Sequence, residues 1–344
     1  MIDIEAPEDG GNPRETGAIQ RLDEGHFRVV PFSEDGDGNY KFALHVRAHN
    51  SAAVSVPLTL EIDWDDHKYM VSRDFVHVGH SGEWRLVPAE VDGSISRLRC
   101  LLPPGESRIG VSPAYGWADH DVFAAQTLAT SFQRELIGRS EQGRAIDAYH
   151  LGAGQRNLLV IARVHPYETA ASFCAEGLLR WLTMPGEAQA RVLARFHVVV
   201  VPMPNPDGVY LGLCKRTGLH GTDISHEAVG SGDAEARALL DLIEQLRPDR
   251  YLDIHGWMHA DEDGLHYHDQ AVADRFLAGT ADQPALARNR WKGTLARPDG
   301  RSPLSHCAQH FATRALSVSY RWPGRTVDQM RAIGAASLEA FAAD

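Results

Sequence analysis

Three short apolar segments, spaced by two amphipathic ones, constrain the fold of this 344-residue chain more than any other feature. The apolar segments are LLVIAR (158–163), FHVVVVP (196–202) and YLDI (251–254), and the patterns between them predict helices over 169–183 and 234–246. Strands that are hydrophobic almost throughout are buried on both faces, which is typical of a largely parallel sheet covered by helices. The sequence therefore predicts an α/β domain.

The end of the chain predicts two further elements of this domain. ALSVSY (315–320) reads as a core strand, and Thr326 with Gln329 three residues later is the pattern of a capping box that begins the last helix. The stretch between Trp257 and Pro303 is polar and rich in Gly, Asp, His and Arg. We expect a long lid or binding loop there.

The first third of the chain has a different pattern. Its runs KFALHVRAH, VSVPLTLEID and EWRLVPAEV alternate apolar and polar residues, and turn-rich pieces such as EDGDGN separate them. Such alternation is typical of antiparallel strands with one buried face. We therefore predict an antiparallel β-sandwich over residues 1–120, followed over 121–344 by the α/β domain, a mixed and largely parallel sheet with helices on both faces.

The charge and the cysteines exclude several kinds of partner and site. A net charge of −12 without a basic patch argues against a nucleic acid or an anionic membrane as partner. The acidic start lacks the features of a secretory signal, and no run approaches the roughly 20 apolar residues of a membrane span. We expect a cytoplasmic protein, and a homo-oligomer is left open. The cysteines lack CxxC spacing and are expected to be buried, unreactive thiols: Cys100, Cys174, Cys214 and Cys307.

The sharpest local feature is HPYE (165–168), at the junction of a predicted strand and a predicted helix. A second predicted strand ends in DIHG (253–256), where the glycine lets the backbone turn sharply. Imidazole nitrogen and carboxylate oxygen both suit zinc, and three protein ligands with one open position define a catalytic site. Strand ends of open α/β sheets are also where ligands bind. His165, Glu168 and His255 are therefore the predicted ligands of a single Zn²⁺.

Other histidines suggest competing zinc sites. His255 and His259 have HxxxH spacing, but Gly256 stands where a helical HExxH protease needs its glutamate. His266 and His268 could chelate a metal from an extended segment, although solvated loop histidines are the more ordinary interpretation. His259 is a candidate for the lining of the cleft.

Three segments in order, RVHPYETAASFCAEGLLRWL, VVVPMPNPDGV and YLDIHG, resemble the zinc carboxypeptidases, in particular their cytosolic carboxypeptidase-like branch. The resemblance covers roughly 124–344, and PPGESRIGVSPAYGWAD followed by GRSEQGRAI resembles the end of that branch's β-sandwich and the entry to its peptidase domain. It implies zinc ligands at His165, Glu168 and His255. It also places Asp223 where the family has a carboxylate that orients the first histidine.

One departure from the family concerns the catalytic base. In these enzymes a glutamate near the end of a late core strand activates the metal-bound water. Alignment of ALSVSYRWPGRTVDQMR with that strand puts Ser319 at its place, and serine is no general base at neutral pH. Three explanations stay open: a carboxylate from elsewhere, with Asp261, Glu262 and Asp263 as candidates; an impaired enzyme or binding protein; or an engineered substitution.

The remaining departures concern substrate recognition. Ser225 and His226 stand where the family has an Asn-Arg pair that grips a terminal carboxylate, so bidentate capture is lost. Arg216 matches the family's oxyanion-stabilising cation if one gap is placed, whereas alignment from the left selects Lys215. The segment 320–322 could put an aromatic and a cation at the cleft mouth, and core packing of its aromatics is the alternative.

Together these observations favour a zinc-dependent metallohydrolase that cleaves an amide bond of a peptide tail or of a small amide metabolite, with Arg216 stabilising the oxyanion. A catalytically impaired or engineered-inactive carboxypeptidase-like binding protein is the first alternative, motivated by Ser319. The second is a zinc esterase or deacylase that needs no terminal carboxylate, motivated by Ser225 and His226.

Overall fold

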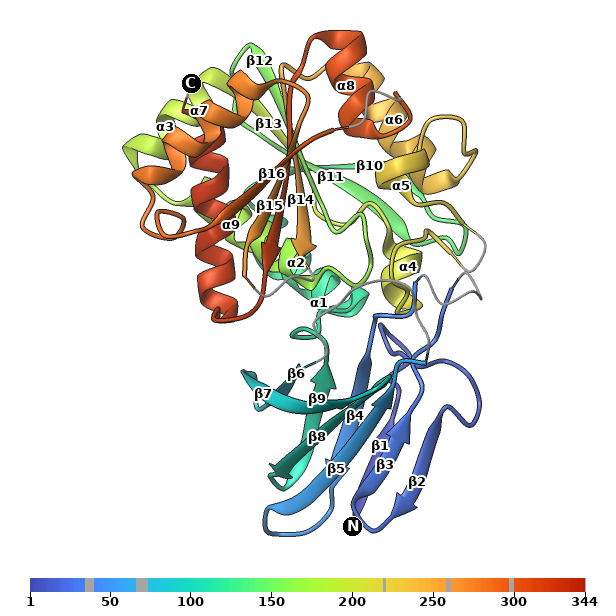
Figure 1. The fold of residues 1–344 in the computed structure, drawn as a ribbon. Helices are drawn as coiled ribbons and strands as arrows, with labels where there is room; N and C mark the ends of the chain where they lie inside the picture. The colour runs from blue at the N-terminus through green and yellow to red at the C-terminus, as the bar shows by residue number, and fades with distance from the viewer. Residues whose placement is uncertain (35–39, 66–73, 219–220, 258–260, 297–299, 344) are drawn as a thin grey trace.

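The computed structural model describes residues 1–34, 40–65, 74–218, 221–257, 261–296 and 300–343. The strands in these residues form two sheets, one in the N-terminal third of the chain and one in the remainder (Figure 1). Each sheet packs around apolar cores of its own.

The N-terminal sheet has the strand order β1-β4-β9-β6-β7-β8-β5-β3-β2 in the described residues. Its strands are β1 (Ile2–Glu5), β2 (Ile19–Asp23), β3 (His26–Val29), β4 (His45–Asn50), β5 (Val56–Asp63), β6 (Phe75–His80), β7 (Glu83–Asp92), β8 (Ile95–Leu102) and β9 (Gly105–Gly110). The first part of β7 pairs with β6 and its last part with β8, so the sheet has two halves. Side chains of both halves, among them Val46, Ile109, Leu60 and Leu98, share one core, as a sandwich requires.

One strand pair of this sheet differs from the predicted antiparallel pattern. β3 and β5 run parallel, with His26 opposite Thr59 and Val29 opposite Ile62. The chain passes from β3 into β4 in the other half of the sheet and then returns as β5 beside β3. A connection that crosses to the other half and returns brings the second strand back in the same direction, and local alternation of apolar residues does not encode this.

The second sheet has the order β10-β11-β13-β12-β14-β17-β15-β16. Its strands are β10 (Gln133–Arg139), β11 (Ala145–Leu151), β12 (Arg156–Ala162), β13 (Phe196–Val201), β14 (Arg250–Trp257), β15 (Asp263–Tyr267), β16 (Trp291–Leu295) and β17 (Arg314–Arg321). The four central strands β13, β12, β14 and β17 are parallel to their neighbours in this group. Antiparallel strands flank them, which gives a mixed sheet with a parallel centre.

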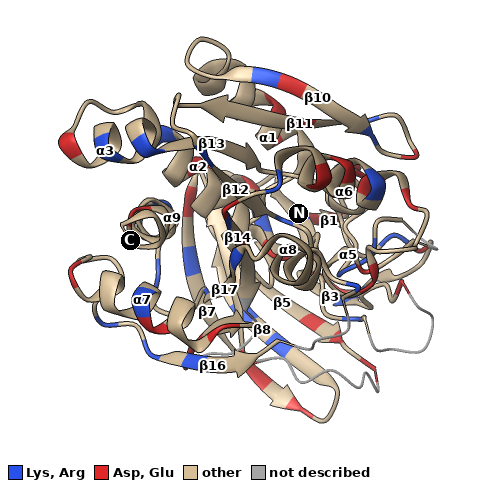
Figure 2. Cartoon of the chain, turned by 90° about the horizontal axis from the view of Figure 1, so that it is seen from above, with Lys and Arg blue, Asp and Glu red and all other residues tan. Residues whose placement is uncertain are grey.

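Helices cover both faces of the second sheet, as Figure 2 shows in the view from above. One face packs against α1 (Trp117–Phe123), α2 (Thr169–Thr183), α3 (Glu187–Arg195), α7 (Gln270–Ala281) and α9 (Val327–Ala342). The other packs against α5 (Ile224–Glu227), α6 (Ala234–Leu246) and α8 (Pro303–Phe311). The short helices η1 (Ala124–Leu128) and α4 (Pro206–Tyr210) complete the described helices. The predicted helices over 169–183 and 234–246 are confirmed, as is the capping box of Thr326 and Gln329.

The predicted long loop between Trp257 and Pro303 is wrong. This stretch contains β15, α7 and β16, and β15 pairs with the core strand β17. The helix α7 buries an apolar stripe that includes Val272 and Phe276. The polar composition hid these elements, because β16 is the largely exposed edge strand of the sheet and needs few apolar residues.

The predicted boundary between residues 120 and 121 falls within α1, whose Phe123 belongs to the core of the second sheet. The division of the chain at that residue stays a prediction. No helix in the described part of the chain is long and apolar enough to cross a membrane. All four cysteines are free thiols, and three of them are buried, while Cys100 is half-buried.

The buried His77 of β6 makes stability depend on pH. Its Nδ1 lies 3.0 Å from the carbonyl oxygen of Val111, and its ring meets Trp322 edge-on at 5.9 Å. Burial lowers the pKa of His77 from its ordinary 6.5 to about 4. Between these two pH values the unfolded chain binds more protons than the folded one, so we expect the free energy of unfolding to fall by roughly 2–3 kcal/mol as the pH drops through this window.

Urea unfolding at several pH values between 7 and 4 measures this effect. The variant His77→Asn should show a flatter dependence of stability on pH than the unmodified chain. His49→Asn, which changes an exposed histidine of β4, is the matched control and should keep the original slope. Equal slopes in all three proteins would contradict the assignment to His77.

Candidate metal centre

Two neighbouring parallel strands bring the three predicted zinc ligands together. β12 and β14 are paired, and Ala162 at the end of β12 lies opposite Ile254. His165 lies three residues after the end of β12, Glu168 precedes the first turn of α2, and His255 follows Ile254 in β14. All three side chains are buried. Their convergence at the carboxyl ends of adjacent strands is where α/β sheets place ligands.

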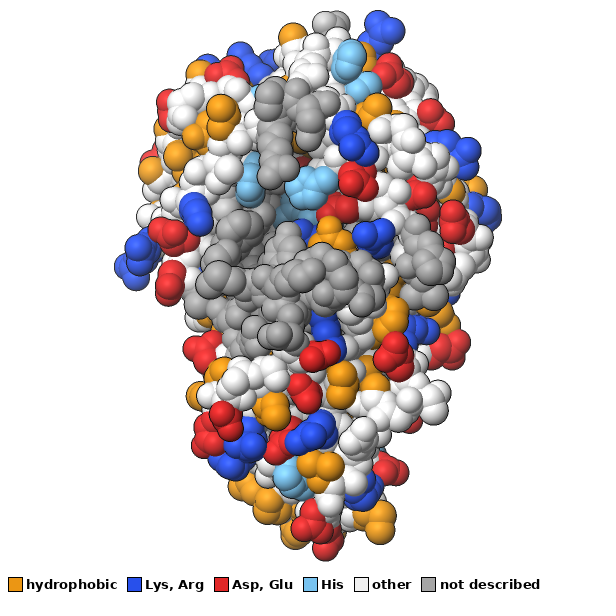
Figure 3. Space-filling view, turned by 45° about the vertical axis from the view of Figure 1, so that its right-hand side comes forward, with side chains coloured by type: hydrophobic (Ala, Val, Ile, Leu, Met, Phe, Trp, Pro, Cys, Tyr) orange, Lys and Arg blue, Asp and Glu red, His pale blue; other side chains and the backbone are white. Residues whose placement is uncertain are grey.

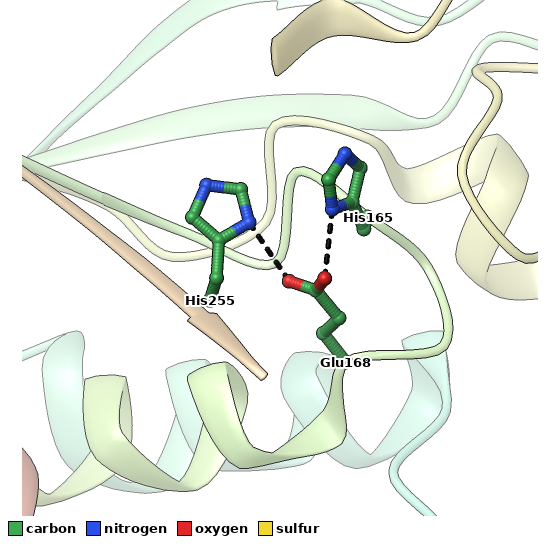
Figure 4. Close-up of side chains that lie close together, drawn as sticks. All are labelled: His165, Glu168 and His255. Carbon is green, nitrogen blue, oxygen red and sulfur yellow. Dashed lines mark hydrogen bonds and ion pairs between the residues drawn. The ribbon is translucent and has the colours of Figure 1, made fainter. Parts of the chain in front are cut away.

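The carboxylate of Glu168 lies between the two imidazoles (Figure 4). Nδ1 of His165 is 2.8 Å from Oε1, and Nδ1 of His255 is 2.8 Å from Oε2. One ligand atom of each residue lies within 4.8 Å of those of the other two. Two imidazole nitrogens and a carboxylate oxygen converging on one point form the donor set of a catalytic zinc site, which keeps further positions open.

Gly256 lets Glu168 approach the end of β14 closely. Its backbone N–H donates to Oε2 of Glu168 at 2.9 Å. A Cβ atom added at residue 256 would lie 2.9 Å from Cβ of Glu168 and 3.1 Å from its Cα, closer than carbon atoms tolerate. The glycine predicted to allow a sharp turn therefore serves chiefly to leave room for the carboxylate ligand.

A carboxylate orients each imidazole from the side opposite Glu168. Nε2 of His165 lies 3.1 Å from Oδ1 of Asp223, the role that the resemblance implied. Nε2 of His255 lies 3.0 Å from Oδ2 of Asp253, which the sequence analysis did not single out. Such partners fix the tautomer so that Nδ1 faces the metal, and they raise the basicity of the ligand. The signal for Asp253 was its position two residues before His255, because alternate residues of a strand share a face.

In this cluster, the carboxylates and the imidazoles each stabilise the charged form of the other. Burial alone would raise the pKa of Glu168, but the imidazoles of His165 and His255 hold it well below its ordinary value. Burial would lower the pKa of His255, whereas the carboxylates of Asp253 and Glu168 raise it well above its ordinary value. The buried carboxylates thus keep negative charge in a cluster that favours a bound cation.

Arg163 holds the backbone around the first ligand. It is buried, has a left-handed backbone conformation with φ of 59°, and directly follows β12. Its guanidinium donates to the carbonyl oxygens of Pro166 and Tyr115, at 2.7 and 2.9 Å, and to the hydroxyl of Ser172 at 2.8 Å. The segment that carries His165 is therefore tied both to α2 and to the segment before α1.

The sheet register shows which side chains share a face with His255. In one row across β14, β17 and β15, His255 lies opposite Ser319, and Ser319 opposite Gly264. One pleat deeper, Asp253, Ser317 and His266 form a second row. Laterally paired residues point to the same side of a sheet. These side chains thus form a polar patch on the face covered by α5, α6 and α8.

The polar patch corrects the interpretation of two histidines. His266 is half-buried on β15 and lies on the face that carries His255, not in a solvated loop. Burial, reinforced by the charges of His255 and His226, lowers the pKa of His266 to about 4. Nε2 of His268 lies 2.9 Å from the hydroxyl of Ser305 in α8. Figure 3 shows histidine side chains gathered in a hollow of this part of the molecule. His259, a candidate for the cleft lining, lies outside the described residues.

The three acidic residues considered as substitutes for the base differ in their contacts. Asp263 is buried, and its carboxylate forms a two-pronged ion pair with Arg325, at 2.7 and 2.6 Å. Glu262 lies 3.7 Å from Arg290, and Asp261 is exposed. Because Asp263 precedes Gly264, its side chain points to the face opposite His255. It is therefore no candidate for the base.

Ser225 and His226 lie on opposite sides of His165. The hydroxyl of Ser225 donates to Oδ1 of Asp223 at 2.8 Å and lies 2.6 Å from Nε2 of His165, so it belongs to the hydrogen bonds behind the ligand. The ring of His226, an exposed residue, has its centre 6.4 Å from that of His165. Of the two, His226 is the residue placed at the surface of the site.

Both candidate oxyanion cations lie in the same loop beside Tyr40. Nζ of Lys215 and the guanidinium carbon of Arg216 are 5.7 and 5.5 Å from the ring centre of Tyr40. Arg216 donates to the carbonyl oxygen of Gly221 at 3.1 Å. Lys215 is buried. Burial would raise the pKa of Asp223, but the charges of His165 and Lys215 lower it. The charge of Lys215 therefore acts on Asp223, the carboxylate behind His165.

The aromatics of segment 320–322 belong to the core. Tyr320 is fully buried, with its hydroxyl 2.5 Å from that of Ser337 in α9. Trp322 is buried and packs edge-on against Phe173 at 5.6 Å. Of the two interpretations of these aromatics, core packing is therefore confirmed for both residues. Arg321, on the face of Ser319, donates to the carbonyl oxygen of Pro323.

Comparison with known proteins confirms the resemblance seen in the motifs. The sequence model of the zinc carboxypeptidase family matches residues 125–227. Over these residues the chain is similar to the zinc carboxypeptidases. The chain is 31% identical to human cytosolic carboxypeptidase 6 over 227 residues, which cover 57% of this chain and 45% of that protein. It is 26% identical to a protein of Zymomonas mobilis, with 78% of this chain and 72% of that protein covered.

Solved structures share the whole fold. A metallo-carboxypeptidase from Burkholderia cenocepacia covers 100% of this chain and 98% of its own, with a TM-score of 0.84 and 17% identity. A metallo-carboxypeptidase from Pseudomonas aeruginosa, solved in complex with (2-guanidinoethylmercapto)succinic acid, covers 99% and 98%, with a TM-score of 0.83 and 19% identity. These matches confirm the carboxypeptidase-like fold. The chain spans less than half the length of human cytosolic carboxypeptidase 6.

The contact between Asp253 and His255 predicts an effect on metal affinity. The variant Asp253→Asn keeps the shape of the side chain but removes the charge that stabilises the ligand imidazole. We expect zinc affinity, measured by competition with a chromogenic chelator, to fall about 10- to 100-fold. Asp269→Asn, which makes the same change at the N-cap of α7, is the control and should leave the affinity unchanged. An unchanged affinity of Asp253→Asn would show that Asp253 does not support the ligand.

Proposed function

We propose that the chain is a zinc-dependent hydrolase of amide bonds, acting on a peptide tail or a small amide metabolite, whose substrate is held without an arginine clamp. The observation that carries this proposal is the convergence of His165, Glu168 and His255 within 4.8 Å, with a carboxylate behind each imidazole. A buried cluster of this composition is the form that catalytic zinc sites take. The match of residues 125–227 to the zinc carboxypeptidase model supports the same class of reaction.

These residues fit one zinc ion. Nδ1 of His165, a carboxylate oxygen of Glu168 and Nδ1 of His255 would hold it, while Asp223 and Asp253 keep the Nε2 protons on the far side of the rings. A zinc ion bound there supplies a Lewis acid that polarises a carbonyl group and lowers the pKa of water.

In this proposal, two cationic side chains stabilise the oxyanion that develops in the reaction. Lys215 and Arg216 lie in one loop, and the charge of Lys215 reaches Asp223. A cation fixed near the reacting carbonyl stabilises the transition state, because the negative charge is larger there than in the substrate. We propose that the pair together fills the role for which the resemblance offers Arg216 or Lys215.

The proton acceptor in this proposal is His266. Ser319 offers no base, and among the described side chains on the His255 face of β14, β15 and β17 the one carboxylate is that of Asp253, which is bonded to His255. His266 lies on the same face and in the row of Asp253, and its imidazole is the group proposed to take the proton.

The surface of the site near His226 favours a substrate whose carboxylate is not bound by an arginine. His226 is exposed beside His165, and its single ring cannot form the two parallel hydrogen bonds that a guanidinium makes. We therefore propose that substrates with a capped carboxylate are accepted, including esters and acylated amines.

A catalytically silent binding protein is the second candidate. The observation that favours it is the serine on β17 between His255 and Gly264, a buried position without acid–base capacity. Such a protein would keep the metal site and hold an amide or peptide without cleaving it.

Metal dependence tests the leading proposal first. Purified chain should take up one zinc ion per molecule, as measured by atomic emission, and the variant His165→Ala should take up none. Hydrolysis of a panel of free and capped peptides, small amides and esters should require zinc and be lost in His165→Ala. A chain that binds no stoichiometric zinc would refute the proposal.

Two further variants separate hydrolase from binding protein. In the hydrolase, His266→Ala should lower kcat by about 10²-fold, the usual contribution of a general base, with little change in KM. His268→Asn is the control variant, because His268 contacts Ser305, and it should have only a small effect on kcat. Activity that appears only in Ser319→Glu, and is absent from the unmodified chain, would support the silent binding protein instead.

A further inference from the structure

A carboxylate from the N-terminal domain is buried against the loop that carries Lys215 and Arg216. Glu34 follows β3, and 7% of its surface is exposed. Its Oε2 accepts the backbone N–H of Cys214 at 2.6 Å, and its Oε1 accepts those of Lys215 and Arg216 at 2.7 and 2.9 Å. Three consecutive N–H groups therefore point to one side chain of the other domain.

This arrangement fixes the backbone of the loop on one side. Successive N–H groups rarely point to one place, so three hydrogen bonds to a single carboxylate specify the conformation of residues 214–216. Burial raises the pKa of Glu34 to about 7, and the three backbone N–H donors oppose that rise. The cost of burying this carboxylate is offset only while the loop keeps its conformation.

Asn205 fixes the same loop on its other side and ties it to the metal centre. Its Nδ2 donates to the carbonyl oxygen of Arg216 and to that of Val164, each at 3.0 Å. Val164 directly precedes the ligand His165. A displacement of the loop is therefore resisted from the metal side by Asn205 and from the N-terminal domain by Glu34.

Two aromatic residues of the N-terminal domain, Tyr40 and Phe42, also contact this loop. The backbone N–H of Phe42 donates to Sγ of Cys214 at 3.4 Å, and its ring meets that of Tyr167 edge-on at 4.7 Å. Tyr167 lies between the ligands His165 and Glu168 in the sequence. Tyr40 supplies the ring beside both cations.

We infer that Glu34 is a positioning residue, which holds residues 214–216 so that Lys215 and Arg216 present their charge to an anion at the metal centre. The inference deepens the proposed function and rests on it. It assigns the N-terminal domain a part in the reaction: without Glu34 the cations would lose their fixed place although the metal ligands would keep theirs. The ligand that reports this role is a tetrahedral oxyanion.

Inorganic phosphate is the probe, titrated calorimetrically into the zinc-loaded full chain. Glu34→Gln keeps one oxygen but sets an amide N–H against the backbone donors, so we expect the Kd for phosphate to rise about tenfold, equal to about 1.4 kcal/mol. Zinc affinity should stay unchanged. Glu61→Gln is the matched control, because Glu61 is equally buried in the same domain but pairs with Arg28 and Arg97, and it should leave phosphate binding unchanged.

A double-mutant cycle shows whether Glu34 acts through the cations. In a chain with Lys215→Gln and Arg216→Gln, adding Glu34→Gln should produce no further loss of phosphate affinity. Glu34→Asp, which keeps the charge on a shorter side chain, should recover part of the affinity and serves as the second variant if Glu34→Gln does not fold.

The outcomes separate this inference from the proposed function. A chain that takes up no zinc rejects the proposed function. Zinc uptake together with equal phosphate affinity in Glu34→Gln and the unmodified chain overturns the inference alone. It is likewise overturned if the zinc-loaded chain binds no phosphate, or if the loss in Glu34→Gln persists at full size without the two cations.

Discussion

The carboxylate of Glu168, shared by His165 and His255, is the interaction on which the site depends. It requires that β12 and β14 be neighbours in parallel, because only then do a loop after one strand and a residue at the end of the other meet at one edge. It also requires a glycine after His255, since any side chain there would meet Glu168. Burial of these three polar side chains costs little free energy because each has hydrogen-bond or ion-pair partners. A cation bound among them would take the place of the protons that they share.

The sheet explains why polar residues gather on one face only. Along β14 and β17, the side chains that face α2, α7 and α9 are apolar up to the strand ends. On the other face, residues are apolar only at the start of each strand and polar toward its end: Tyr251, Asp253 and His255 on β14, and Ala315, Ser317 and Ser319 on β17. On that second side α5 has a single turn. The polar side chains at the strand ends are buried, so the site depends on the hydrogen bonds and ion pairs that they form with one another.

The sequence was informative wherever structure follows from nearby residues. Apolar runs, the capping box and the two ligand motifs each lie within a few residues, and the strands, helices and ligand residues they predicted are where the structure has them. Pairings between distant segments could not be read in this way. The position of β15 beside β17 gives His266 its neighbours, and the contact of Glu34 with residues 214–216 joins segments about 180 residues apart. No periodicity encodes such contacts.

The departures from the family pattern differ in their place in the site. Asp223 and Asp253 orient the ligands, and Ser225, which departs from the resemblance, joins the hydrogen bonds behind His165. The other two departures, His226 and Ser319, lie outside this set of hydrogen bonds. A chain that had merely lost its function would gain nothing from two buried carboxylates whose desolvation is offset by a charged metal cluster. The pattern supports the proposal of a metal centre that serves another substrate and uses another proton acceptor.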